Sequence, residues 1–311
     1  MVPYIIKRFL IMIMMLTALS MVVYVLFFAI PSDPAALTCG KNCTPQIIEF
    51  IKGIVVGRTY GSGTAAFFCH VPCFGYSFNQ QEQVTDLFLA VFPVTAYLAL
   101  GAFILWMIMG ITTGILAARV KGSIIDRSIM GMTLVGYSLP SFFIGLLIMI
   151  FFVIRWHWVP FPDYLPPQEN FFQFFQTMIF PWVTLATLYA AYYTRLTRSQ
   201  MLDTMSEDYI RTARAKGLPE KKVIRKHAFR AGLTPIVTSA GMDFAGLLGG
   251  AVVTEKIFHL GGLGNIAITA VNNLDLPILV ATTLLAGVFV VVANLVVDIL
   301  YAAIDPRVRI A

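Results

Sequence analysis

Long stretches of the chain contain no charged side chain. Five such runs, free of Asp, Glu, Lys and Arg, are Phe9–Ile30, Leu87–Ala118, Ser128–Ile154, Asn170–Thr194 and Leu276–Val297. A helix needs about 20 apolar residues to cross the hydrocarbon core with its backbone satisfied internally, so each run predicts one membrane span. A sixth run, about Ala231–Thr254, is interrupted only by Asp243. We therefore expect an all-α polytopic membrane protein whose residues 1–311 form a single transmembrane domain of about six helices.

The first run has an alternative interpretation as the apolar part of a cleaved signal peptide, because Lys7 and Arg8 precede it. Signal peptides carry apolar regions of roughly 7 to 15 residues, and the run Phe9–Ile30 is longer. No small-x-small cleavage site closes it before Pro31. We expect an uncleaved first span.

The composition agrees with a membrane protein. Hydrophobic residues make up 58% of the chain and charged residues only 12%, whereas soluble domains carry about a quarter charged residues. Basic loops remain cytoplasmic, and with a cytoplasmic N-terminus 17 of the 22 Lys and Arg residues fall inside. Topology therefore explains the net charge of +6, without nucleic-acid binding. Both termini are expected in the cytoplasm.

An external segment, residues 31–86, separates the first two predicted spans. It contains four cysteines, namely Cys39, Cys43, Cys69 and Cys73. An even number of cysteines on the side where disulfides persist favours two disulfides, with three possible connectivities. A zinc site assisted by His70 is the alternative. We expect disulfides and no metal.

The predicted cytoplasmic loop, residues 195–230, carries signals for a short helix. Thr204 with Glu207 fits a capping box, Gly217 suits a left-handed C-cap, and Pro219 follows where a helix cannot continue. They predict a helix at about Met205–Lys216 and a second at about Glu220–Phe229. Either the loop lies on anionic lipid headgroups, or the small residues Ala213, Ala215 and Gly217 form a surface for another protein.

Several sequence stretches carry a family resemblance. The loop contains Glu207-Asp-Tyr-Ile-Arg-Thr-Ala-Arg-Ala-Lys-Gly-Leu218, then His227-Ala-Phe-Arg230 and Leu233-Thr-Pro235; farther on comes Gly249-Gly-Ala-Val-Val-Thr-Glu-Lys-Ile-Phe258 with Gly262-Leu-Gly264. The loop sequences resemble the cytoplasmic signature of inner-membrane permeases of binding-protein-dependent ABC importers, most closely the peptide and nickel branch. The later stretch resembles the end of the family's fifth span and the external hairpin that follows it. The family's signature opens on an acidic residue where this chain has Arg211, a replacement common in the peptide branch. Pro31-Ser-Asp-Pro34 and the segment from Asp298 to Arg307 also resemble the family, whereas the run from Gln46 to Gly57 is short for the family's external helical segment.

The resemblance implies a type I importer permease in a bacterial inner membrane, with a coupling helix that sits in a cleft of an ATPase subunit. The coupling residues it indicates are Tyr209, Ile210, Arg211, Ala213, Arg214, Ala215, Lys216 and Gly217. It also implies a second related permease, two ATPase subunits that hold ATP and Mg, and an external solute-binding protein. Alternating access would then carry peptides, or another small solute such as a nickel chelate or a glutathione-like compound.

The chain itself carries no ATPase motif or cofactor signature. Its Gly40-Lys41 pair is followed by Asn42 rather than Ser or Thr, so it lacks the phosphate-binding pattern. An ion-coupled secondary transporter would more often show inverted repeats, and a membrane enzyme would need a convergent set of catalytic side chains. Asp243 is the ionisable residue within a predicted span; it either lines the pore or bonds a neighbouring span near Gly241. Glu255 and Lys256 are expected at the outer interface.

Overall fold

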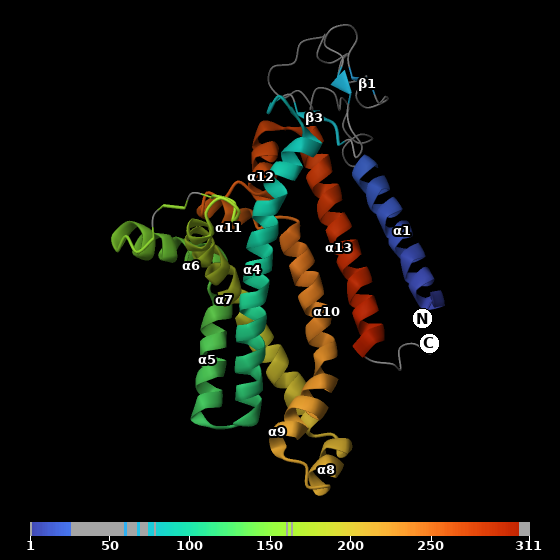
Figure 1. Cartoon of the computed structure of the whole chain (residues 1–311), viewed down its shortest axis with the longest axis vertical. Coiled ribbons are helices and arrows are strands. Elements are labelled where there is room, and N and C mark those ends of the chain that lie inside the picture. The colour runs from blue at the N-terminus through green and yellow to red at the C-terminus, as the bar shows by residue number, and fades with distance from the viewer. Residues whose placement is uncertain are drawn as a thin grey trace.

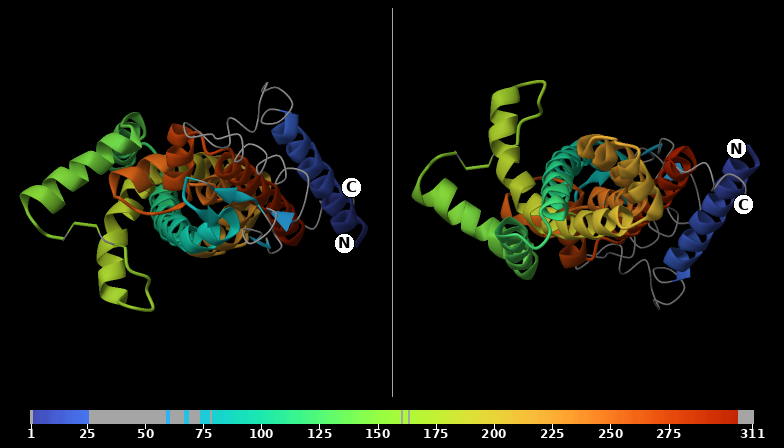
Figure 2. Two further views of the ribbon diagram at one scale, coloured as in Figure 1. Left: turned by 90° about the horizontal axis from the view of Figure 1, so that it is seen from above. Right: turned by 90° about the horizontal axis from the view of Figure 1, so that it is seen from below.

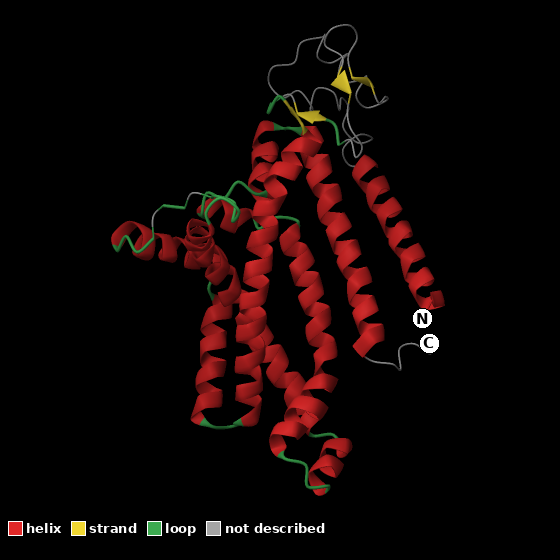
Figure 3. Cartoon of the chain, in the orientation of Figure 1, coloured by secondary structure: helices red, strands yellow, loops and turns green. Residues whose placement is uncertain are grey.

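Helices make up nearly all of the chain that the structure describes (Figure 3). The computed structural model describes residues 2–25, 59–60, 67–68, 74–77, 79–159, 161–162 and 164–304. The helices are α1 (Val2–Tyr24), α4 (Val84–Arg119), α5 (Ile124–Ser138), α6 (Ser141–Ile148), π-helical η4 (Met149–Arg155), α7 (Phe171–Met205), α8 (Asp208–Ala215), α9 (Glu220–Lys222), π-helical η5 (Val223–Ala228), α10 (Phe229–Leu248), α11 (Val252–Ile257), α12 (Leu263–Asn273) and α13 (Leu276–Ile304).

Short strands lie at the end of the molecule where α4 begins (Figure 3). They form two antiparallel pairs, β1 (Thr59–Tyr60) with β2 (Phe67–Phe68), and β3 (Tyr76–Ser77) with β4 (Glu82–Gln83). Cys39, Cys43, Cys69 and Cys73 fall outside the described residues, so their pairing stays a prediction.

Among the residues that the structure describes, five helices are long and apolar enough to cross a bilayer. They cover Ile6–Val23, Val84–Arg119, Phe171–Met205, Glu220–Leu248 and Leu276–Ile299. A sixth crossing results if α5 is taken together with α6 and η4. The expected all-α fold of about six spans is confirmed.

The third predicted span is not a straight helix. Its two halves, Ile124–Ser138 and Ser141–Arg155, are bent by 94° relative to each other. Leu139 has extended backbone (φ −88°, ψ 125°), because the residue before a proline is pushed out of the helical region, and Pro140 then starts α6. As a result α6 projects sideways from the bundle (Figures 1 and 2). A charge-free run gives the length of apolar chain and not its direction, so the sequence predicted a span here but not its bend.

The core forms where α4 packs along α7. Glycines on α4 let the two backbones approach closely: a Cβ at Gly110 would stand 2.5 Å from the Tyr193 Cβ, and one at Gly114 would stand 2.6 Å from the Thr197 Cβ. Lipid provides little hydrophobic drive for association between helices, so such small-residue contacts carry much of the packing. The large side chains Trp106 and Tyr193 are fully buried beside them.

The first helix lies at the edge of the bundle against α13 (Figure 2). Arg8 Nη1 pairs with Asp298 Oδ2 at 3.1 Å, and the Leu19 side chain occupies the space that a Cβ at Gly287 would need. Met14 and Met21 are exposed on other faces of α1, where a bilayer would surround them. Both a polar and a steric contact therefore hold α1 against α13.

Gly101 provides a test of the α4–α7 packing. The Trp182 indole lies over this glycine and donates from Nε1 to the Tyr97 carbonyl at 3.0 Å, so a Cβ at Gly101 would overlap the ring. We expect Gly101→Ala to destabilise the protein by about 1–3 kcal/mol through overpacking. Thermal unfolding of the purified protein in detergent measures the effect. As a control, Gly131→Ala on α5 meets nothing within 4 Å and should be neutral or stabilising; equal melting temperatures for the two variants would contradict this packing.

Candidate functional site

The short helix α8 lies at the tip of the molecule farthest from the strands, between α7 and α9 (Figure 1). Its existence confirms the predicted helix, but its start differs. Thr204 belongs to the last turn of α7 and donates from Oγ1 to the Gln200 carbonyl at 2.7 Å. Glu207 is the N-cap of α8 with no side-chain capping bond. The predicted capping box was wrong, because α7 extends to Met205 and the Thr204 hydroxyl bonds a carbonyl of that helix instead of capping α8.

One face of α8 is buried within this chain. Ile210 is 0% exposed and Ala213 is 9% exposed. They pack in a cluster with residues from the ends of α4 and α7 and from η5, namely Ala118, Met201, Val223, Ile224 and Ala228. Ala213 therefore anchors α8 to its own chain, so its expected place on a surface for another protein was wrong.

The end of α8 is closed by a Schellman motif around Gly217. Gly217 has φ +74°, its N–H donates to the Arg214 carbonyl at 2.9 Å, and the Leu218 N–H donates to the Ala213 carbonyl at 3.4 Å. Leu218 packs on the same cluster as Ala213, which is the hydrophobic contact that usually accompanies this motif. The predicted left-handed C-cap is confirmed, and a left-handed backbone at this position favours glycine.

A charged pair joins α8 to the next helix. Arg214 donates from Nε and Nη2 to the two carboxylate oxygens of Glu220 at 3.1 and 2.8 Å. The Glu220 carboxylate raises the pKa of the Arg214 guanidinium, so this fork remains charged. The pair spans the turn at Pro219 and helps to set the orientation of α8 relative to α9.

The opposite face of α8 is open. Tyr209 is 44% exposed, and partial burial raises the pKa of its phenol, with the Glu207 charge adding to the effect. Its exposed neighbours are Arg211, Thr212, Ala215 and Lys216. This outward face, Tyr209, Arg211, Thr212, Ala215 and Lys216, combines an aromatic ring, small side chains and cations. Arg211 pairs only loosely with the exposed Asp208, at 3.5 Å.

The second predicted helix is not separate. α9, η5 and α10 follow one another without a break from Glu220 to Leu248, so the predicted end near Phe229 was wrong. The buried Val223, Ile224 and Ala228 beneath α8 therefore belong to the same continuous helical segment as the fifth span. A force on α8 would be passed directly to α10.

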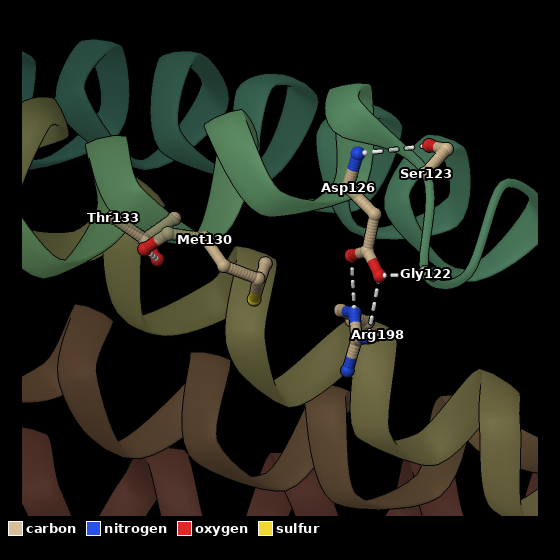
Figure 4. Close-up of polar contacts among 6 residues, drawn as sticks. All are labelled: Gly122, Ser123, Asp126, Met130, Thr133 and Arg198. Atoms are coloured by element: carbon tan, nitrogen blue, oxygen red, sulfur yellow. Dashed lines mark hydrogen bonds and ion pairs between the residues drawn. The ribbon is translucent and has the colours of Figure 1, made fainter.

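α5 begins at the same end of the bundle as α8 (Figure 1), and a second polar junction joins its first turn to α7 (Figure 4). Asp126, in the first turn of α5, is 3% exposed and receives both Arg198 Nε and Arg198 Nη2 from α7 at 2.7 Å. Its Oδ2 also accepts the Gly122 N–H at 2.8 Å, and Ser123 caps the helix by accepting the Asp126 N–H at 3.2 Å. Bidentate pairing of a buried carboxylate fixes geometry as well as charge. α5 is thus pinned to α7 just before α7 leads into α8.

Asp243 has a partner on a neighbouring span. Tyr193 on α7 donates from Oη to Asp243 Oδ2 on α10 at 2.6 Å. This hydrogen bond agrees with the alternative in which Asp243 bonds a neighbouring span, and that span is α7. Asp243 is only partly buried, so a role in lining the pore stays a prediction.

Glu255 makes contacts that the sequence did not lead us to expect. It is fully buried on α11, and accepts from Thr95 Oγ1 on α4 at 2.8 Å and from the Asn265 N–H on α12 at 2.9 Å. The Ala251 N–H adds a longer bond of 3.3 Å. The side chain is enclosed by its own chain, because the hairpin of α11 and α12 folds its donors around this carboxylate; its expected level at the outer interface stays a prediction. Glu255 thereby fastens the hairpin to α4.

Comparison with known proteins identifies this arrangement. The family described as the binding-protein-dependent transport system inner membrane component matches residues 110–310, and the N-terminal component of such systems matches residues 1–52 and 46–99. The chain belongs to this family of importer permeases. The α8 region and the Glu255 hairpin both fall within the first match, in agreement with the resemblance found in the sequence.

Relatives resemble the permease over nearly its whole length. A putative peptide transport system permease protein of Brucella abortus (strain 2308) is 36% identical over 99% of both chains. A probable peptide ABC transporter permease protein of Sinorhizobium fredii (strain NBRC 101917 / NGR234) is 33% identical over 98% of this chain and 99% of its own. The glutathione transport system permease protein GsiC of Escherichia coli (strain K12) is 34% identical over 99% of both chains.

A solved structure supports the fold. The permease matches a chain of the inward-facing MetNI methionine ABC transporter with a TM-score of 0.54, covering 71% of this chain and 97% of that one. Sequence identity is 18%, so the likeness concerns architecture alone. The expected ABC importer permease fold is confirmed.

Gly217 allows the α8 cap to be tested. We expect Gly217→Val to destabilise the seated α8 by about 1–2 kcal/mol, because a β-branched residue resists the left-handed backbone. Hydrogen exchange of residues 208–218 should then be roughly 5 to 30 times faster. Gly217→Asn is the matched control, since asparagine tolerates this conformation and a Cβ there meets nothing within 4 Å. Equal protection in the two variants would argue against a left-handed cap.

Proposed function

We propose that this permease forms half of the translocation pore of an ATP-driven peptide importer and that α8 is its coupling helix. Relatives named for peptide and glutathione transport share at least 33% identity over nearly the whole chain, which supports a peptide cargo. A glutathione-like compound is itself a small peptide, and a nickel chelate is the alternative outside this class.

One observation carries the coupling role: α8 is held firmly on one face and bare on the other. Ile210 and Ala213 fix it to three other elements, whereas Tyr209 and Ala215 are exposed at the far tip of the chain. A helix that merely filled a loop would gain nothing from an open face joined to so firm an anchorage. The open face fits contact with a separate subunit that pushes or pulls on α8.

The anchorage provides the path for motion. The cluster beneath α8 contains Met201 from α7 and Val223 from the segment that continues into α10, so a displaced α8 would carry the ends of both spans. We propose that ATP-driven closure of two ATPase subunits tilts these spans and opens the pore outward, and that a second related permease forms the other half. An external solute-binding protein would deliver the peptide. ATP and Mg would be held by the ATPase subunits, whose energy biases the pore only through contacts that differ between its two states.

The orientation we propose places both termini and α8 in the cytoplasm of a bacterial inner-membrane system. The distribution of basic residues supports it. In a chain whose four native cysteines are replaced, Ser206→Cys beside α8 should react with a membrane-impermeant thiol reagent only after the cells are opened. Labelling of Ser206→Cys in intact cells would show that the topology is the reverse of the one proposed. Lys256→Cys, after the fifth span, is the control for the opposite side and should be labelled in intact cells.

Ala215 provides the test of coupling. It is exposed on α8, so Ala215→Trp should leave the permease folded and overfill the contact with the ATPase. Overpacking costs about 1–3 kcal/mol, so we expect roughly a tenfold or greater loss of ATPase retention. The measurements are co-purification of the ATPase and solute-stimulated hydrolysis in reconstituted vesicles.

Two further variants make the result specific. Lys121→Trp places the same ring on the exposed turn between α4 and α5 and should leave retention unchanged. Ala213→Trp should instead lower the melting temperature of the isolated permease, because it fills the cluster within the chain. Normal transport and normal ATPase retention by Ala215→Trp would remove the coupling role from this face.

A further inference from the structure

The segment between α8 and the fifth span carries a dense basic surface of its own. Within residues 221–230 every charged side chain at neutral pH is a cation, and the set is Lys221, Lys222, Arg225, Lys226 and Arg230. All five are exposed. With Pro219 they line an open groove of about 640 Å³ on α9, η5 and the start of α10. We call this surface the basic groove.

The basic groove lacks a counter-charge within the described part of the chain. The nearest acidic residue in sequence, Glu220, already accepts hydrogen bonds from Arg214 Nε and Nη2. None of the five cations forms an ion pair with a described residue. Helical spacing places Lys222 near Lys226 and Lys226 near Arg230, and like charges four residues apart repel. The fold therefore concentrates positive charge that an external anion would neutralise.

The alignment of these cations follows from the packing behind them. Val223, Ile224 and Ala228 are buried in the cluster beneath α8, with Phe229 packed against it, which leaves the five cations on the exposed side. The lining of the groove is mostly apolar although five of its six residues are Lys or Arg, so their aliphatic stems make up much of it. Such a surface offers an apolar floor and several donors to one anionic group.

Position distinguishes the basic groove from the outward face of α8. α8 lies at the extreme tip, while α9 and the start of α10 lie between it and the helical bundle (Figure 1). Directly after Arg230 the chain enters the uncharged part of the fifth span, beginning at Ala231. In the orientation proposed above, this boundary is the level of the cytoplasmic headgroups, where polybasic segments attract anionic lipids.

We infer that the basic groove binds the phosphodiester headgroup of an anionic phospholipid at the cytoplasmic end of the fifth span. The lipid neutralises the repelling cations and holds the η5 turn, which supports α8, at the membrane surface. This inference rests on the proposed orientation but not on coupling to an ATPase. The loop then contacts lipid through its second half and another protein through its first.

The test uses the full-length permease purified in neutral detergent, with no ATPase and no cargo. Dioleoyl phosphatidylglycerol should raise its melting temperature in a saturable manner, whereas phosphatidylcholine and inorganic phosphate at the same concentration should not. Each Lys or Arg near an anionic surface strengthens binding roughly fivefold, so Lys222→Gln with Lys226→Gln should weaken the apparent affinity about 25-fold. The response should also fall as salt is raised.

A matched pair controls for net charge. Lys121→Gln with Arg127→Gln removes two exposed cations, one from the α4–α5 turn and one from the first turn of α5, and should keep the wild-type lipid response. Without lipid, the Lys222/Lys226 pair of substitutions should be at least as stable as wild type, because it relieves repulsion; this separates lost binding from misfolding.

Three results would overturn the inference. One is an equal phosphatidylglycerol response in wild type and in the Lys222/Lys226 variant. Another is equal stabilisation by inorganic phosphate, which would make the groove a site for free anions. The third is an unchanged lipid response together with loss of ATPase retention in lipid-free detergent, which would assign the groove to an acidic protein surface. Failure of the coupling experiment on Ala215 would leave this test unaffected.

Discussion

The close contact of α7 with its neighbours is the constraint on which the other spans depend. In lipid, helices gain little from hydrophobic association, so small-residue packing and a few polar links must hold them. α7 provides both. Trp182 and Thr194 link it to α4, Tyr193 links it to Asp243 on α10, and Arg198 links it to Asp126 on α5. Glycines on α4 then let its backbone approach α7 closely.

This arrangement has a mechanical consequence, because α8 follows directly from α7. The last turn of α7 and the η5 turn together form the floor beneath Ile210. A displacement of α8 therefore acts on α7 and on α10 simultaneously. Tyr193 and Asp243 connect the same two helices farther into the bundle, so the two spans are joined at two levels and are expected to move as a unit.

The sequence predicts the elements that depend on composition. Charge-free runs locate the spans, and Gly217 locates the α8 cap, because hydrocarbon thickness and left-handed backbone impose strong local requirements. The bend at Pro140 has a local signal as well, although an uncharged run conceals it. Ser123 followed by Asp126 is likewise a visible helix start, but its Arg198 partner lies 72 positions away.

Burial of polar side chains depends on tertiary contacts that no local pattern encodes. Glu255 reads as an interfacial charge beside Lys256, yet donors from α4 and α12 enclose it. Ala213 reads as a docking residue among small neighbours, yet the neighbouring helix ends cover it. Both differences arise because sequence spacing gives the face of a helix and not what that face meets.

In the two proposals made above, the interpretations that the sequence leaves open for residues 195–230 apply to different halves of this loop. The first half, α8, carries both signs of charge and a bare outward face, whereas the second half, residues 221–230 beyond Glu220, carries only basic charge and leads into the span. Val223 and Ile224 join the halves, since they pack beneath α8 from the helix that bears the basic groove. If occupancy of the groove moves that helix and thereby changes the affinity of α8 for its proposed protein partner, the two binding events are coupled. Thermodynamic linkage then requires the partner to change lipid affinity by the same factor. Local lipid composition and coupling would thus be two readouts of one equilibrium, set by the packing of a few apolar side chains between them.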